Sequence, residues 1–77
     1  MKKVQINRTR LGLNIRRHRR YIRRMTQVQL AEQIGCSSQL ISALEHGKRE
    51  LSVEMLLRLC HALSCTPDDL LRDVEIE

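Results

Sequence analysis

The stretch TQVQLAEQIG, residues 26–35, opens the segment TQVQLAEQIGCSSQLISALEHGK that decides the fold. Thr26 and Gln29 have the spacing of a capping box, in which each side chain bonds the backbone N–H of the other residue. Gly35 suits the left-handed residue that commonly ends a helix. The stretch therefore predicts a short amphipathic helix. Its expected apolar face consists of Val28, Leu30, Ala31 and Ile34.

A second short helix follows almost immediately. Ser37 or Ser38 is its expected N-cap, and Gly47 its expected end. Because little more than Cys36 separates the two helices, they must cross sharply rather than lie antiparallel. The inward residues are expected to be Leu40, Ile41 and Leu44. Polar residues gather instead at the start of this second helix.

Three further helices are expected around this pair. The first spans roughly residues 10–23, and the last two begin after the caps Ser52 and Thr66. With no convincing core strand, the chain is expected to be all-α, a compact five-helix domain. The expected inward residues are Leu11, Ile15, Arg19 and Ile22 in the first helix and Leu56, Leu59, Cys60 and Leu63 in the fourth.

Apolar and polar residues alternate at both ends of the chain. Residues 1–9 form a basic arm or a short strand, and residues 73–77 form an acidic tail that is a possible dimer contact. The helical domain is expected to span residues 10–72. The sequence allows two alternatives for these ends. They form a strand pair, within one chain or across a dimer, or they are two frayed tails.

The amino-acid composition and charge limit the kinds of partner that the chain can have. The chain has 77 residues and a formal net charge of +5, and residues 1–24 contain basic residues but no acid, which suits a polyanionic partner. The single aromatic residue, Tyr21, argues against modules that stack single-stranded bases on aromatic rings. Double-stranded DNA is therefore the favoured partner. No long apolar run predicts a signal peptide or membrane span, so we expect a cytoplasmic protein.

Catalysis and metal binding find no support in the sequence. Cys36, Cys60 and Cys65 have neither a disulfide-framework pattern nor zinc-site spacing, and each stands where a small apolar residue would serve. We see no nucleophile with a base in reach, no carboxylate pair and no phosphate-binding loop. The sequence predicts a non-enzymatic protein without metal, cofactor or small-molecule ligand.

Two short helices that cross at a tight turn are typical of a helix-turn-helix. In that motif the second helix enters the major groove and reads base edges from its N-terminal end. Glutamine can pair with adenine, serine with several bases, and an alanine methyl can touch thymine. Ser38 could equally be only a helix cap. The candidate base-reading residues are Ser38, Gln39, Ser42 and Ala43.

Residues 11–71 resemble the Cro and phage-repressor class of helix-turn-helix regulators, also called the Xre family. The matching pieces are TQVQLAEQIG, SSQLISALEHGKR and LLRLCHALSCTPDDLL. The resemblance implies a domain of the lambda-repressor-like DNA-binding type. It also implies DNA phosphate contacts by Gln27, Ser37, His46, Lys48 and Arg49.

The resemblance further implies an ion pair between Arg19 and Glu45 that links the first and third helices. The chain departs from the family at residues 22–25, where it has one residue more and lacks a frequent glycine. Arg20 therefore remains an alternative to Arg19.

The expected function is a sequence-specific transcriptional regulator, a repressor that binds an inverted-repeat operator as a homodimer. The alternative is an antitoxin or a protein-interaction module built on the same fold. The family commonly dimerises through its last two helices and the residues beyond them. The candidate dimer contacts are Leu70, Leu71, Val74 and Ile76.

Overall fold

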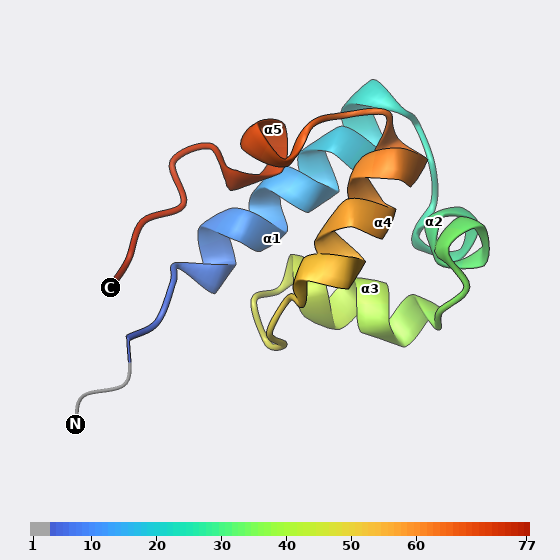
Figure 1. Ribbon diagram of the computed structural model, residues 1–77. Coiled ribbons are helices and arrows are strands. Elements are labelled where there is room, and N and C mark those ends of the chain that lie inside the picture. The colour runs from blue at the N-terminus through green and yellow to red at the C-terminus, as the bar shows by residue number, and fades with distance from the viewer. Residues whose placement is uncertain (1–3) are drawn as a thin grey trace.

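The computed structural model describes residues 4–77 and is all-α, as the sequence predicts (Figure 1). Its helices follow one another through short connections. They are α1 (Arg8–Arg17), the π-helical segment η1 (His18–Ile22), α2 (Gln27–Ile34), α3 (Ser38–Glu45), α4 (Val53–Leu63) and α5 (Pro67–Leu71). α1 lies between α5 on one side and α3 on the other (Figure 1).

Local capping signals set the helix starts. Thr26 forms a capping box with Gln29, and Ser52 and Thr66 cap α4 and α5, as predicted. Of the two predicted candidates Ser37 and Ser38, Ser37 caps α3. α1 begins earlier than the sequence suggested. The Asn7 side chain accepts a hydrogen bond from the Arg10 amide at 3.0 Å, so Asn7 is the cap and Arg8 is already helical.

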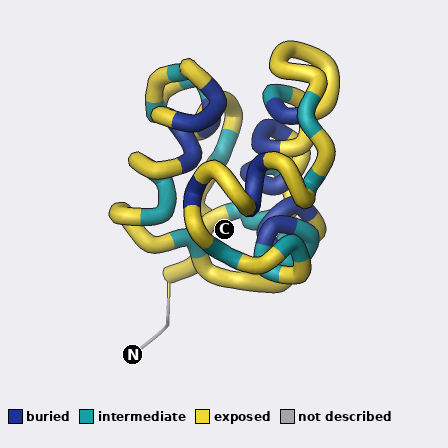
Figure 2. Tube along the Cα trace, turned by 90° about the vertical axis from the view of Figure 1, so that its right-hand side faces the viewer, coloured by how far each residue is buried: buried dark blue, intermediate teal, exposed yellow. Residues whose placement is uncertain are grey.

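The core fills the space between the five α-helices, and buried segments of the chain face one another across it (Figure 2). Its fully buried large side chains are Ile15, Leu30, Ile41, Leu59, Leu63 and Leu70. The predictions for Val28 and Ile22 were wrong, since both side chains are exposed. An eight-residue helix such as α2 buries one narrow stripe, here Leu30, Ala31 and Ile34, and Val28 lies outside it.

The chain has one residue more than the family pattern before α2, and the wider π-helical turn of η1 accommodates it. The Arg23 amide donates to the His18 carbonyl at 2.9 Å, an i→i−5 bond that encloses one residue more than an α-helical turn. The Met25 amide then donates to the Arg19 carbonyl at 2.8 Å. This widened turn buries Arg19 and leaves Ile22 on the surface.

The ends of the described chain pair with each other within one molecule. Ile6 and Ile76 form an antiparallel bridge. The Asn7 amide donates to the Glu75 carbonyl at 2.8 Å, and the Glu77 amide donates to the Gln5 carbonyl at 2.7 Å. Of the two open alternatives, strand pairing within one chain is therefore present. Lys2 and Lys3, part of the expected basic arm, lie outside the described residues.

The cysteines are free thiols in or beside the core, as expected. Burial disfavours the thiolate and, with Cys60 alongside, raises the pKa of Cys65 to about 12, against 9.0 for an ordinary thiol. The thiolate fraction at pH 8 is then lower by about a thousandfold.

We expect iodoacetamide at pH 8 to leave Cys65 unmodified in the folded protein and to modify it readily in denaturant, as mass spectrometry would show. Equal rates in both states would contradict this burial.

Candidate nucleic-acid interface

The turn between α2 and α3 fixes the angle at which the two helices cross. Gly35 has φ +76°, a left-handed conformation, and its amide donates to the Ala31 carbonyl at 2.9 Å. The Cys36 amide donates to the same carbonyl at 3.0 Å. Ser37 then caps α3, its Oγ accepting from the Leu40 amide at 3.1 Å. The chain thus leaves α2 and enters α3 within three residues.

α3 has one buried face and one accessible face. Ile41, Leu44 and Glu45 are buried against the rest of the domain. Gln39 is exposed on the other side, and three further predicted base-reading residues are partly exposed there. These are Ser38, Ser42 and Ala43. The structure therefore gathers the four candidates on the accessible surface of a helix whose other face is held by the core.

The end of α3 presents cationic side chains. Gly47 has φ +71°, its amide donates to the Leu44 carbonyl at 3.2 Å, and the Lys48 amide donates to the Ala43 carbonyl at 2.9 Å. This is a Schellman motif, which leaves Lys48 and Arg49 exposed just beyond the helix.

His46 closes the same helix end with its side chain. Its Nδ1 lies 2.7 Å from the Ser42 carbonyl oxygen. A carbonyl only accepts, so Nδ1 carries a proton and donates. Nε2 is then the ring nitrogen that remains available to another group at this helix end.

The ion pair involves Arg19 and not Arg20. Arg19 bonds Glu45 through Nε and Nη2, with 3.0 Å from Nη2 to Oε1, and the two side chains are only 8% and 1% exposed. Arg19 Nη1 also donates to the Met25 carbonyl at 2.7 Å. Gln27 Nε2 donates to Glu45 Oε1 at 3.1 Å. The buried pair therefore orients Gln27, the expected phosphate contact at the start of α2.

A family model described as "Helix-turn-helix" matches residues 15–70, which is most of the chain. The chain belongs to this helix-turn-helix family. The chain is thus a DNA-binding transcription regulator of the Xre/Cro helix-turn-helix type. No curated protein sequence matches the chain.

Solved structures of helix-turn-helix proteins share the fold. The clp gene regulator ClgR from Corynebacterium glutamicum has a TM-score of 0.77 and 38% identity, over 83% of this chain and 82% of that one. The DNA-binding domain of the P22 C2 repressor has a TM-score of 0.75 and 37% identity, over 87% of each chain. The restriction-modification controller protein C.AhdI from Aeromonas hydrophila has a TM-score of 0.75 and 27% identity, over 80% and 92%.

For this helix-turn-helix chain the expected dimer contacts need one correction. Leu70 was wrongly included, because its side chain is 0% exposed and belongs to the core. Leu71 and Ile76 are 38% and 72% exposed, and Val74 is half-buried. Among the candidates, these three remain accessible.

Sequence reasoning missed Arg8 as a member of the cationic surface at the end of α3. Arg8 lines the same shallow pocket as Lys48 and Arg49, and its Nη2 lies 2.9 Å from Glu50 Oε1. The signal was Asn7, whose capping role starts α1 early enough to carry Arg8 to this place.

Within residues 4–77 no helix is both long and apolar enough to cross a membrane. In the same range, His, Cys, Asp and Glu side chains form no group of three or more that could hold a metal ion.

Proposed function

We propose that the chain is a sequence-specific repressor that binds an inverted-repeat operator in double-stranded DNA as a homodimer. The accessible face of α3 carries this proposal. It presents Gln39, Ser42 and Ala43, while the opposite face is buried in the core. A helix supported in this way can enter the major groove with its polar side chains directed at base edges.

Phosphate contacts on both sides of α3 would set its register in the groove. The Ser37 N-cap stands at the start of α3, and Gln27, oriented by Glu45, stands at the start of α2. Beyond the end of α3 the Schellman motif exposes Lys48 and Arg49. Arg8 lines the same pocket as these two residues, and His46 directly precedes the motif's glycine in the chain. These contacts supply affinity, whereas α3 supplies specificity.

Dimerisation is supported by the apolar surface of the paired chain ends. Ile6 and Ile76 face each other in a non-hydrogen-bonded pair, so their side chains lie on one face of the ribbon. Both are exposed, as is Leu71. A two-stranded ribbon is marginally stable alone, and a second copy would cover this surface. We propose Leu71, Val74 and Ile76 as dimer contacts.

The experiment that tests the function is selection from a randomised duplex library at fixed, near-physiological salt, followed by sequencing. An enriched inverted repeat with half-sites about 34–36 Å apart, one helical turn, would support a dimeric, sequence-reading regulator. Weak, salt-sensitive binding without enrichment would contradict it. A partner protein that co-purifies with the chain would then favour the interaction module.

Substitutions on α3 and beyond it should have different effects. Gln39→Ala is expected to reduce discrimination by about 1–3 kcal/mol at one base pair per half-site, because a bidentate base contact is lost. Lys48→Ala is expected to weaken all sequences alike and to lower the salt slope by about one unit, because a phosphate contact is lost. Fluorescence anisotropy with the selected operator and single-base variants, at several salt concentrations, measures both. Equal sequence profiles for Gln39→Ala and the wild type would contradict the role of Gln39.

A further inference from the structure

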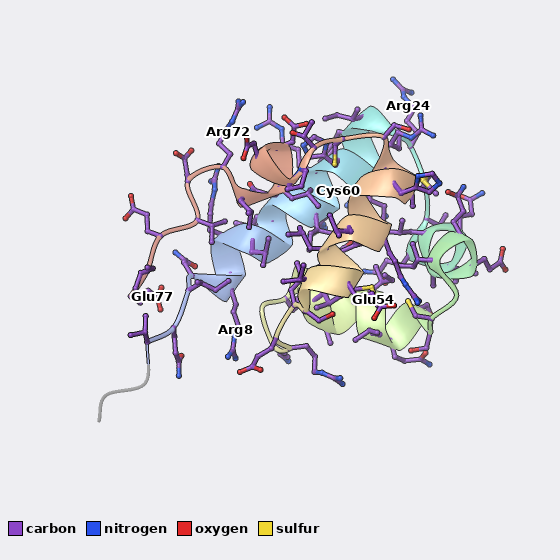
Figure 3. All side chains as sticks on the ribbon, in the orientation of Figure 1. Arg8, Arg24, Glu54, Cys60, Arg72 and Glu77 are labelled. Carbon is purple, nitrogen blue, oxygen red and sulfur yellow. The ribbon has the colours of Figure 1, made fainter. Side chains whose placement is uncertain are left out.

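A pocket of about 180 Å³ lies between α1, η1 and α5. Its charged lining consists of Arg10, Arg17, His18, Asp69 and Arg72, and we call it the α1–α5 pocket. Arg72 lies beside α5, on the side of α1 opposite α3 (Figure 3). The pocket is therefore separate from the proposed DNA-binding surface.

The α1–α5 pocket carries an excess of positive charge. Three arginines line it against one acid, Asp69, for a net charge of +2 without counting His18. Asp69 Oδ2 accepts from the Thr66 amide at 2.9 Å, and this capping bond is part of what lowers the pKa of Asp69. Asp69 is thus ionised but already occupied. At the rim, Arg10 Nη2 is 3.7 Å from Asp73, whose side chain is largely exposed.

Two buried nitrogens of the lining have no hydrogen-bond partner within residues 4–77. They are Arg10 Nε and His18 Nδ1. The guanidinium Nε can only donate, and leaving a buried donor unpaired is costly. An acceptor inside the pocket would satisfy such a donor. Water could supply the acceptor but would leave the charge unbalanced, whereas an anion supplies both.

We propose that the α1–α5 pocket binds a small dianionic oxyanion, either free phosphate or the phosphate end of a small phosphomonoester. The net charge of the pocket matches a dianion, and guanidinium groups suit phosphate oxygens in bidentate pairs. The volume suits a phosphate-sized group, being smaller than the roughly 300–1,000 Å³ of sites for drug-sized ligands.

A bound anion would connect α1 with the segment after α5. Asn14 Nδ2, in the same lining, already donates to the Leu70 and Arg72 carbonyls at 2.8 Å each. An anion held by Arg17 and Arg72 would add a second link at this place. That segment leads into residues 75–77, which pair with residues 5–7.

The test is a titration of ¹⁵N-labelled full chain with inorganic phosphate at constant ionic strength, followed by amide chemical shifts. We expect saturating shifts at Asn14, His18 and Leu70, with a Kd of about 1–10 mM. The double variant Arg17→Gln/Arg72→Gln should weaken binding about tenfold or more, because two charge-assisted contacts are lost. Both side chains are exposed, so the fold should survive, and the spectrum reports this directly.

The matched control is Arg16→Gln/Arg23→Gln, which removes the same charge from exposed positions outside the pocket. It should bind phosphate within about twofold of the wild type. Saturating shifts confined to the α2 and α3 starts, shifts that never saturate, or equal loss in both double variants would each overturn the proposal. Glycerol 3-phosphate separates the two sources: tighter binding than phosphate assigns a phosphomonoester, and equal or weaker binding assigns free phosphate.

Discussion

Glu45→Ala is expected to lower the free energy of unfolding by about 3–5 kcal/mol. The substitution leaves the Arg19 guanidinium charged in a site where its side chain is only 8% exposed. Arg19 keeps the Met25 carbonyl as a neutral acceptor but loses both bonds to carboxylate oxygens. Gln27 loses its acceptor as well. The cost arises mainly from the stranded charge, since an intact buried pair contributes little net stability.

Urea unfolding followed by circular dichroism measures this effect. The matched control is Glu54→Ala, which breaks an exposed i,i+4 pair with Arg58 on α4 and should cost no more than about 0.5 kcal/mol. The double variant Arg19→Met/Glu45→Leu should recover most of the lost stability, because neither charge remains buried. Equal destabilisation by Glu45→Ala and Glu54→Ala would mean that Glu45 is accessible to water in solution.

The helix starts could be predicted from sequence because each depends on residues within one turn. Thr26, Ser52 and Thr66 cap as expected, since a capping side chain needs only the amide three residues on. For α3 the sequence left Ser37 and Ser38 open, and Ser37 is the cap. The start of α1 was placed late because Asn7 stands in a basic segment that also suited an arm or strand.

The choice between Arg19 and Arg20 required the structure. An α-helical continuation through residue 25 and a widened turn differ by one residue in register, and the sequence contains no signal for the π-helical segment. The same widening explains why Ile22 is exposed. Leu70 and Leu71 pose a similar problem. α5 has five residues, and the position of α1, whose Asn14 bonds the Leu70 carbonyl, decides which leucine is buried.

The candidate site also has a part that the sequence predicts and a part that depends on tertiary packing. The accessible face of α3 follows from helical periodicity around Ile41 and Leu44, so the sequence predicts it. Arg8 joins Lys48 and Arg49 only through tertiary packing of α1 on the end of α3. The α1–α5 pocket brings Arg10 and Asp69 together across most of the chain, which no local pattern indicates.

Gly12→Ala is expected to destabilise the protein by about 2–4 kcal/mol, although alanine is the better helix former. A Cβ at Gly12 would clash with the Glu45 carbonyl oxygen and would lie 2.6 Å from that of Leu44. Both are backbone atoms, so α1 and α3 would have to move apart. Their separation would also disturb the Arg19–Glu45 pair and the support of α3, so operator affinity should fall with stability.

Gly35→Ala is the matched control, because it makes the same chemical change without a steric clash. Gly35 has φ +76° and open space around it, so alanine there costs only the left-handed conformation, about 1–2 kcal/mol. Thermal and urea unfolding of both variants separate close approach from backbone strain. If Gly12→Ala were as stable as the wild type, α1 and α3 would have to pack farther apart, and the glycine would lose its role in bringing α3 against the core.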